Sequence, residues 1–203
     1  MKLDYRKKYS DLYGVKGEPV VVNVRPLSYL MVDGHGDPNH SREYQDAVAA
    51  LFSLSYTLKF AIKRGAGKDF GVMPLEGQWW CEDMRQFSVD DKSRWLWTLM
   101  ILQPPEVTAA LVSKCRVDLA AKKELPSLGK LRYEEFEEGT CAQILHVGPF
   151  NEEGPTVQRL HAFIEQEQGG RLAGKHHEIY LSDIRRAAPQ KWRTIIRQPY
   201  TAR

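Results

Sequence analysis

Two stretches of the sequence share one pattern: "WTLMILQP" occupies residues 97–104, and "WRTIIRQP" occupies residues 192–199. Each begins with Trp, continues through strand-forming residues with an Ile in the same register, and ends in Gln-Pro. Because Pro has no backbone N–H to donate, it favours the end of a strand inside a sheet. The match predicts an internal duplication, although two unrelated strands that end at Pro would share the same features.

The segments before the first stretch follow a definite order. Residues 18–38 contain β-branched runs interrupted by Pro and Gly, which is typical of one or two strands. Apolar side chains then recur every three or four residues over 41–63, which predicts a long amphipathic helix that stops at Gly65. Residues 64–71 have the composition of a flexible link, and two further strands follow, the second of which ends at Pro104.

The second half repeats this order. Two strands are predicted on either side of the Glu138-Gly139 turn, and Leu160 and Ile164 mark a helix that Gly169-Gly170 closes. Two more strands follow, the last of which ends at Pro199. Both halves therefore read as strand, helix, strand, strand.

This repeated order predicts a single α+β domain over 1–203. We expect an antiparallel sheet built from two pseudosymmetric units, helices on one side of it and a ligand cleft between the halves. The first repeat covers about 18–104, a connecting helix covers about 105–125, and the second repeat covers about 126–200.

Composition narrows the partner classes. The chain has 203 residues, of which 42% are hydrophobic, and this content suits a globule with a substantial core. The net charge of +3 is too small to indicate a nucleic-acid or membrane partner. Residues 184–203 carry six basic and no acidic side chains, which we interpret as a solvated strand and turn. The oligomeric state stays open, and a monomer is compatible with the sequence.

The cysteines and the N-terminus indicate a cytoplasmic protein. Cys81, Cys115 and Cys141 are odd in number and widely spaced, which argues against a disulfide framework and against the paired spacing of a zinc site. Residues 1–14 are charged throughout and lack the apolar region of a signal peptide. We therefore expect a reducing compartment.

Four motifs resemble those of the GyrI-like small-molecule-binding family, and most closely its stand-alone branch, which includes cyclopropanoid cyclopropyl hydrolases. They are "MPLEGQWW" (73–80), "HVGPF" (146–150), "HHEIYLSDIRRAAPQKW" (176–192) and "IIRQPY" (195–200). The resemblance spans nearly the whole chain and implies two related halves with a ligand cleft where they meet. Residues 1–20 are too short for the helix-turn-helix of the family's regulators, so we expect no DNA-binding role.

Glu178 is the leading candidate for a catalytic residue. Strand alternation places His176, Glu178 and Tyr180 on one face of a strand and the apolar Ile179 and Leu181 on the other. The resemblance implies that the Glu178 face lines the ligand pocket, where His176 is a further ligand-binding candidate. A carboxylate held against aromatic side chains loses hydration, which suits a general base. The alternative is an exposed strand glutamate.

Glu76 is the counterpart of Glu178 in the first half. Two facing glutamates could attract a cationic ligand, or one could activate water while the other orients it. A turn carboxylate before Gly77 is an equal alternative. We therefore take Glu76 as a second catalytic candidate.

Aromatic residues supply the predicted ligand surface. Trp80 shares a strand face with Glu76 and Gln78, so it is the first choice for a pocket wall, with Trp79 next. Tyr133 and Tyr180 could each donate a phenol hydrogen bond to a ligand, although half-buried strand tyrosines are commoner. At least half of the tryptophans are expected in the core, and we assign Trp97 and Trp192, which open the two matched strands, to the framework.

The expected function is hydrolysis of a small, planar, hydrophobic molecule for detoxification, by analogy with the family members that open cyclopropane rings. No metal or organic cofactor is required, and the adjacent His176 and His177 point to opposite faces and so do not form a metal pair. The alternatives are non-catalytic binding of lipophilic or cationic drugs, as in multidrug-binding members, and a gyrase-inhibitor-like protein partner role.

Overall fold

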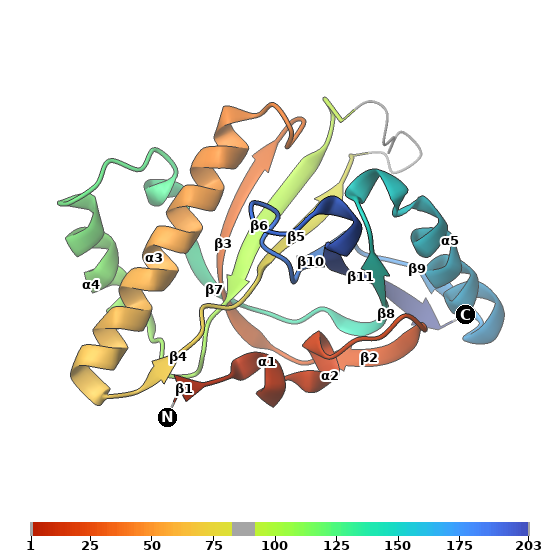
Figure 1. Ribbon diagram of the computed structural model, residues 1–203, viewed down its shortest axis with the longest axis horizontal. Coiled ribbons are helices and arrows are strands. Elements are labelled where there is room, and N and C mark those ends of the chain that lie inside the picture. The colour runs from red at the N-terminus through yellow and green to blue at the C-terminus, as the bar shows by residue number, and fades with distance from the viewer. Residues whose placement is uncertain (1, 83–91, 203) are drawn as a thin grey trace. The chain divides into compact units, whose positions relative to one another are not determined.

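The computed structural model describes residues 2–82 and 92–202 (Figure 1). Its helices are α1 (Tyr5–Lys8), α2 (Ser10–Tyr13), α3 (Arg42–Ala66), α4 (Ala109–Ala120) and α5 (Gly154–Ala162). Its strands are β1 (Lys2–Leu3), β2 (Val20–Val24), β3 (Leu27–His35), β4 (Asp69–Phe70), β5 (Leu75–Trp80), β6 (Leu96–Leu102), β7 (Arg132–Phe136), β8 (Gly139–Val147), β9 (Gly170–Leu172), β10 (His176–Tyr180) and β11 (Arg193–Ala202). None of these helices is long and apolar enough to span a membrane.

The chain divides into two compact units, each made of segments that are distant in sequence. The α3 unit contains the described residues of Met1–Tyr5, Leu27–Met73 and Trp79–Phe136. The α5 unit contains Arg6–Pro26, Pro74–Gln78 and the described residues of Glu137–Arg203. The chain passes from one unit to the other within β5.

The α3 unit is an antiparallel sheet with a long helix against it. β3 pairs with β6 on one side and with β7 on the other. α3 begins at Ser41, whose hydroxyl accepts a hydrogen bond from the Tyr44 amide at 3.2 Å and so caps the helix. Its apolar stripe, which includes Leu51 and Leu58, is fully buried, and the helix contacts β3 and β6 while α4 packs against it (Figure 1).

The end of α3 differs from the sequence-based prediction. The helix continues through Gly65 to Ala66, and Gly67 ends it in the left-handed conformation at φ 68°. The next residues are not a flexible link, because Asp69–Phe70 form β4, which pairs in parallel with β1. Lys63 Nζ lies 2.9 Å from the Asp69 carboxylate and ties the last turn of the helix to this strand.

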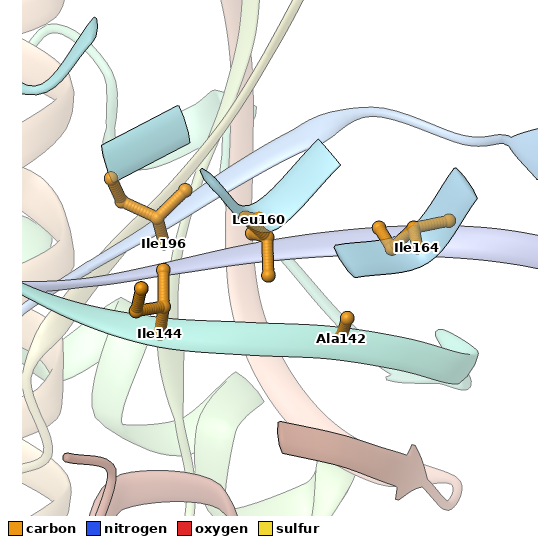
Figure 2. Packing of buried hydrophobic residues seen from close by; sticks show 5 residues of the cluster. All are labelled: Ala142, Ile144, Leu160, Ile164 and Ile196. Carbon is orange, nitrogen blue, oxygen red and sulfur yellow. The ribbon is translucent and has the colours of Figure 1, made fainter. Parts of the chain in front are cut away.

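The α5 unit contains four strands that pair antiparallel in the order β2, β8, β11, β10. One face of it packs against α5 and the π-helical turn Phe163–Glu167 that follows it. Figure 2 shows this contact, in which small and branched apolar side chains from both layers meet. The cluster consists of Ala142, Ile144, Leu160, Ile164 and Ile196, all fully buried.

The N-terminal segment 6–17 lies on the opposite face of the same sheet. Gln143 donates a side-chain hydrogen bond to the Asp11 carbonyl at 2.7 Å, and Arg197 donates one to the Leu12 carbonyl at 3.0 Å. The end of this segment runs along the edge of β8, where the Leu145 amide donates to the Lys16 carbonyl at 2.8 Å. Both faces of the central strands are therefore covered.

The predicted α+β class with antiparallel strands is confirmed. The predicted strands and helices occur in both halves of the chain, but in each half a short strand that was not predicted, β4 or β9, follows the helix. The units do not coincide with these halves, because β2 belongs to the α5 unit and β7 to the α3 unit. The repeat boundaries, the two-fold relation and the cleft between the halves stay predictions.

Candidate functional site

β10 presents two chemically different faces. His177 and Ile179 are fully buried, whereas His176, Glu178 and Tyr180 alternate with them and are partly exposed. The register with β11 pairs His177 with Arg197 and Glu178 with Ile196. Since directly opposite residues share a face, Glu178 lies on the α5 face of the sheet and His177 on the face under the N-terminal segment.

Two side chains of its own strand hold the Glu178 carboxylate. The Tyr180 hydroxyl donates to Oε2 at 2.8 Å, and Nε2 of His176 lies 3.2 Å from Oε1. The side chains of His176 and Glu178 are 12% and 13% exposed, so the carboxylate is largely desolvated but still reachable. Such a group can accept a proton from water or pair with a cation.

Aromatic rings lie beside this carboxylate. Phe150, in the 3₁₀ turn Phe150–Glu152 after β8, packs edge-on against Tyr180 with ring centroids 5.6 Å apart. Its centroid is 4.9 Å from that of Trp192, whose indole N–H donates to the Ala187 carbonyl at 2.8 Å. All three rings are half-buried. A partly exposed aromatic cluster with a fixed polar group is typical of a site for a small organic ligand.

We call this group the Glu178 site, and it comprises Phe150, His176, Glu178, Tyr180 and Trp192. It lies wholly within the α5 unit. In the part of the chain that the structure describes, no three His, Cys, Asp or Glu side chains are arranged to hold a metal ion.

The other face of β10 carries a cluster of ionisable groups buried beneath the N-terminal segment. His177 Nδ1 lies 3.0 and 2.9 Å from the two carboxylate oxygens of Glu138. Its Nε2 lies 3.1 Å from Glu76 Oε2, close enough for an ion pair but not aligned as a hydrogen bond. Arg197 donates to Glu138 at 3.5 Å and to Gln143 at 3.0 Å. Glu76, Glu138, His177 and Arg197 are called the buried charge cluster below.

Opposite charges stabilise this cluster in spite of its burial. Burial alone lowers the pKa of His177, but the Glu138 and Glu76 carboxylates outweigh it and raise the pKa to about 9. Burial raises the pKa of Glu138, and the charges of His177 and Arg197 reverse this and hold it below its usual value. His177 is therefore a cation at neutral pH, matched by the carboxylates around it.

The structure does not bring Glu76 and Glu178 together. Glu76 is fully buried, and its Oε1 accepts a hydrogen bond from the Tyr13 hydroxyl at 2.5 Å. It contacts His177, which points away from Glu178 across β10. This placement favours a structural role for Glu76, and its expected catalytic role stays an untested prediction.

The other predicted ligand-binding residues belong to the α3 unit. Trp79 is 3% exposed and stacks on Tyr44, with ring centroids 6.1 Å apart, so it is part of the core. Trp80 is half-buried. The Tyr133 hydroxyl donates to the Val107 carbonyl at 2.8 Å, which is a framework contact. Trp97 is fully buried, as expected for framework.

Sequence reasoning missed Phe150 and the placement of Trp192, and it misjudged Arg197. Phe150 follows β8 and Trp192 precedes β11, and only the pairing of these strands brings the two rings together. Arg197 is 1% exposed, so the basic segment 184–203 is not uniformly solvated. One signal was available: Arg197 stands in the run "TIIRQP", and a charge among core residues requires a buried partner.

Comparisons with known proteins agree with this fold. An uncharacterised conserved protein from Listeria innocua is 40% identical, with a TM-score of 0.91 over 98% of this chain and 100% of its own. Two hydrolases from Listeria innocua are 39% and 36% identical, with TM-scores of 0.88 and 0.85, and they are covered over their full length by 99% and 98% of this chain.

More distant structures share the fold alone. The C-terminal domain of EcmrR is 11% identical, with a TM-score of 0.56 over 92% of this chain and 98% of its own. No curated protein matches the sequence. The GyrI-like small molecule binding domain matches residues 17–200, which is most of the chain. The chain therefore belongs to the GyrI-like small-molecule-binding domain family.

Proposed function

We propose that the protein binds a small, planar, hydrophobic molecule at the Glu178 site and hydrolyses it, as a cofactor-independent hydrolase that opens a strained ring of a xenobiotic or antibiotic. The observation that carries this proposal is the largely buried Glu178 carboxylate, held by Tyr180 and His176 next to the rings of Phe150 and Trp192. The rings supply stacking surface, and the carboxylate supplies a base.

The reaction needs only this base and a positioned water molecule. Glu178 takes a proton from water as the water oxygen bonds to a ring carbon. The ring C–C bond breaks, and its electron pair moves to the conjugated acceptor group of the substrate. That acceptor then takes the proton back from Glu178 through solvent, so one water is added in total. Stacking against the aromatic rings would hold the substrate in near-attack geometry.

The Listeria innocua proteins support a hydrolase. Two structures described as hydrolases match this chain over nearly its full length at 39% and 36% identity. Family membership supports the coarser statement that the site binds small molecules.

A second candidate is non-catalytic binding of lipophilic cations, and the same geometry favours it. A desolvated carboxylate next to three aromatic rings attracts a positive charge, both through the anion and through the ring faces. In that case Glu178 pairs with the ligand charge and does no chemistry.

One experiment separates the two candidates. The protein is incubated with a cyclopropanoid alkylator, and the products are examined by mass spectrometry for the addition of one water. Hydrolysis predicts this product from the wild type, and predicts that Glu178→Gln binds the probe but does not convert it. Glu167→Gln, an exposed glutamate in the same unit, is the matched control and should retain turnover. Binding with an unchanged ligand mass in the wild type would refute hydrolysis and favour the cation binder.

A cytoplasmic location and the absence of a nucleic-acid partner remain predictions. The three cysteines are free and buried, which agrees with a reducing compartment. Fractionation of cells that express the protein would test the location.

A further inference from the structure

The two oxygens of Glu178 are held by donors from different directions along β10. Tyr180, two residues after Glu178, binds Oε2, and His176, two residues before it, lies within hydrogen-bond distance of Oε1. Tyr180 is fixed in turn by its packing against Phe150. The aromatic packing thus accounts for the position of Tyr180 but not for that of His176, which holds the other carboxylate oxygen.

The contact between His176 Nε2 and Glu178 Oε1 indicates which ring nitrogen of His176 carries a proton when Glu178 is ionised. An ionised carboxylate only accepts, so Nε2 must carry a proton to donate to Oε1. Because Nε2 makes this contact, it is not free to bind a ligand at the same time. A role as a direct ligand contact, which the sequence indicated, is then secondary.

Two contacts restrain the Glu178 carboxylate more than one contact does. A glutamate side chain has three rotatable bonds, and a carboxylate held at a single oxygen can still swing about that contact. Holding both oxygens fixes the plane of the group, and with it the direction in which it accepts a proton. Since the side chains of His176 and Glu178 are nearly nine-tenths buried, water competes little for the contact between them.

The surroundings of His176 restrict it further. His161 of α5 is close enough for the charge of His176 to affect it: burial lowers the pKa of His161, and His176 lowers it further. The nearby Gln198 side chain donates to the Ala173 carbonyl at 2.7 Å and is thereby oriented. Burial and His176 thus favour the neutral form of His161, against the opposing charge of Glu165.

We propose that His176 is a positioning residue, whose Nε2–H holds Glu178 in the orientation that proton abstraction requires. This inference rests on the proposed hydrolysis at the Glu178 site. In this proposal only Glu178 takes the proton. His176 affects the turnover rate of the bound substrate and has little effect on the affinity for that substrate.

Two variants test the proposal. His176→Leu removes the donor, and His176→Gln restores an N–H at similar reach. With a cyclopropanoid probe, His176→Leu should lower kcat by about 100-fold, the scale of a misplaced catalytic group, while KM and the directly measured Kd change less than roughly threefold. His176→Gln should recover most of kcat. An unchanged kcat in His176→Leu, or a loss that appears equally in Kd, would overturn the proposal, and circular dichroism confirms that each variant folds.

A spectroscopic readout makes this test independent of turnover. Nitrogen-15 NMR of the wild type reports which ring nitrogen of His176 is protonated. Protonation at Nε2, the preference for which is lost in Glu178→Leu, supports the proposal. A ring that is protonated only at Nδ1 overturns it. Failure of the wild type to convert the probe would instead refute the hydrolase function, so the two failures are distinguishable.

Discussion

β10 places one histidine on each side of the sheet, and each histidine holds a glutamate. On the α5 face His176 contacts Glu178, and the pair stays partly exposed. On the other face His177 lies between Glu138 and Glu76, and these side chains are at most 3% exposed. The residue types are the same, and their surroundings differ.

The difference lies in how the charges on each face are matched and in how far they are exposed. In the buried charge cluster two basic groups face two carboxyl groups, so each charge is matched and removal of one leaves its partner uncompensated. At the Glu178 site the carboxylate is held by a phenol and an imidazole, and its exposed side is next to aromatic rings. The first arrangement stabilises the fold, and the second can accept a ligand.

The largest expected effect comes from Glu138→Gln. This change keeps the shape of the side chain but removes the charge that faces His177 and Arg197, so it should lower the free energy of unfolding by about 3 to 5 kcal/mol. Urea denaturation measures it. The exposed neighbour Glu137→Gln is the control and should change stability by less than about 0.5 kcal/mol. Equal changes in the free energy of unfolding for the two variants would contradict the claim that the Glu138 charge stabilises the buried charge cluster.

The titration of His177 predicts a loss of stability at alkaline pH. Its pKa is about 9 in the folded protein, above the usual 6.5, so its contribution is complete below pH 6.5 and is lost as the pH rises through about 9. The shift corresponds to about 3 kcal/mol. Chemical denaturation from pH 6 to 10 should show this decline, and His177→Gln should lack it. A flat profile in the wild type would show that His177 is not a buried cation.

A smaller effect is expected when Tyr13 is replaced by Phe. The change removes the hydroxyl that donates to Glu76 and leaves a buried carboxylate oxygen without this donor, at a cost of about 1 to 3 kcal/mol. Tyr56→Phe, at an exposed position on α3, serves as the control for loss of a hydroxyl. If both variants melt at the wild-type temperature, the Tyr13 contact contributes nothing measurable.

The smallest effect should be seen in ligand affinity. Phe150→Leu removes the ring that packs against Tyr180 and Trp192, and we expect the Kd of an aromatic probe to rise roughly fivefold, equivalent to about 1 kcal/mol. Phe60→Leu, an exposed aromatic on α3, should leave the Kd unchanged. Isothermal titration calorimetry measures both, and equal Kd values would place the ligand away from Phe150.

Local patterns predicted the parts of the fold and site that depend on neighbours in sequence. The apolar stripe of α3 follows from spacing alone. Alternation along "HHEIY" correctly assigned His176, Glu178 and Tyr180 to one face and the buried Ile179 to the other. A strand has a period of two, so its faces are readable without tertiary information.

Contacts between distant segments were not predictable in this way. Glu138 lies in a turn, and its carboxylate reaches His177 only because β8 and β10 both flank β11. Tyr13 lies in the N-terminal segment, for which the sequence indicated only a charged composition and no contact with Glu76. The sequence also gives no local signal that β2 pairs in the α5 unit and β7 in the α3 unit. Which strands pair depends on which strand edge is free, and composition does not show this.

The central claim is that Glu178 does chemistry while Glu76 maintains structure, and one paired measurement tests it directly. Turnover of a cyclopropanoid probe and the free energy of unfolding are measured for Glu178→Gln and Glu76→Gln under identical conditions. We predict that Glu178→Gln loses at least about 100-fold in kcat with stability within about 1 kcal/mol of the wild type, and that Glu76→Gln is destabilised but active at low temperature. Full activity in Glu178→Gln, or a stable and inactive Glu76→Gln, would contradict the account.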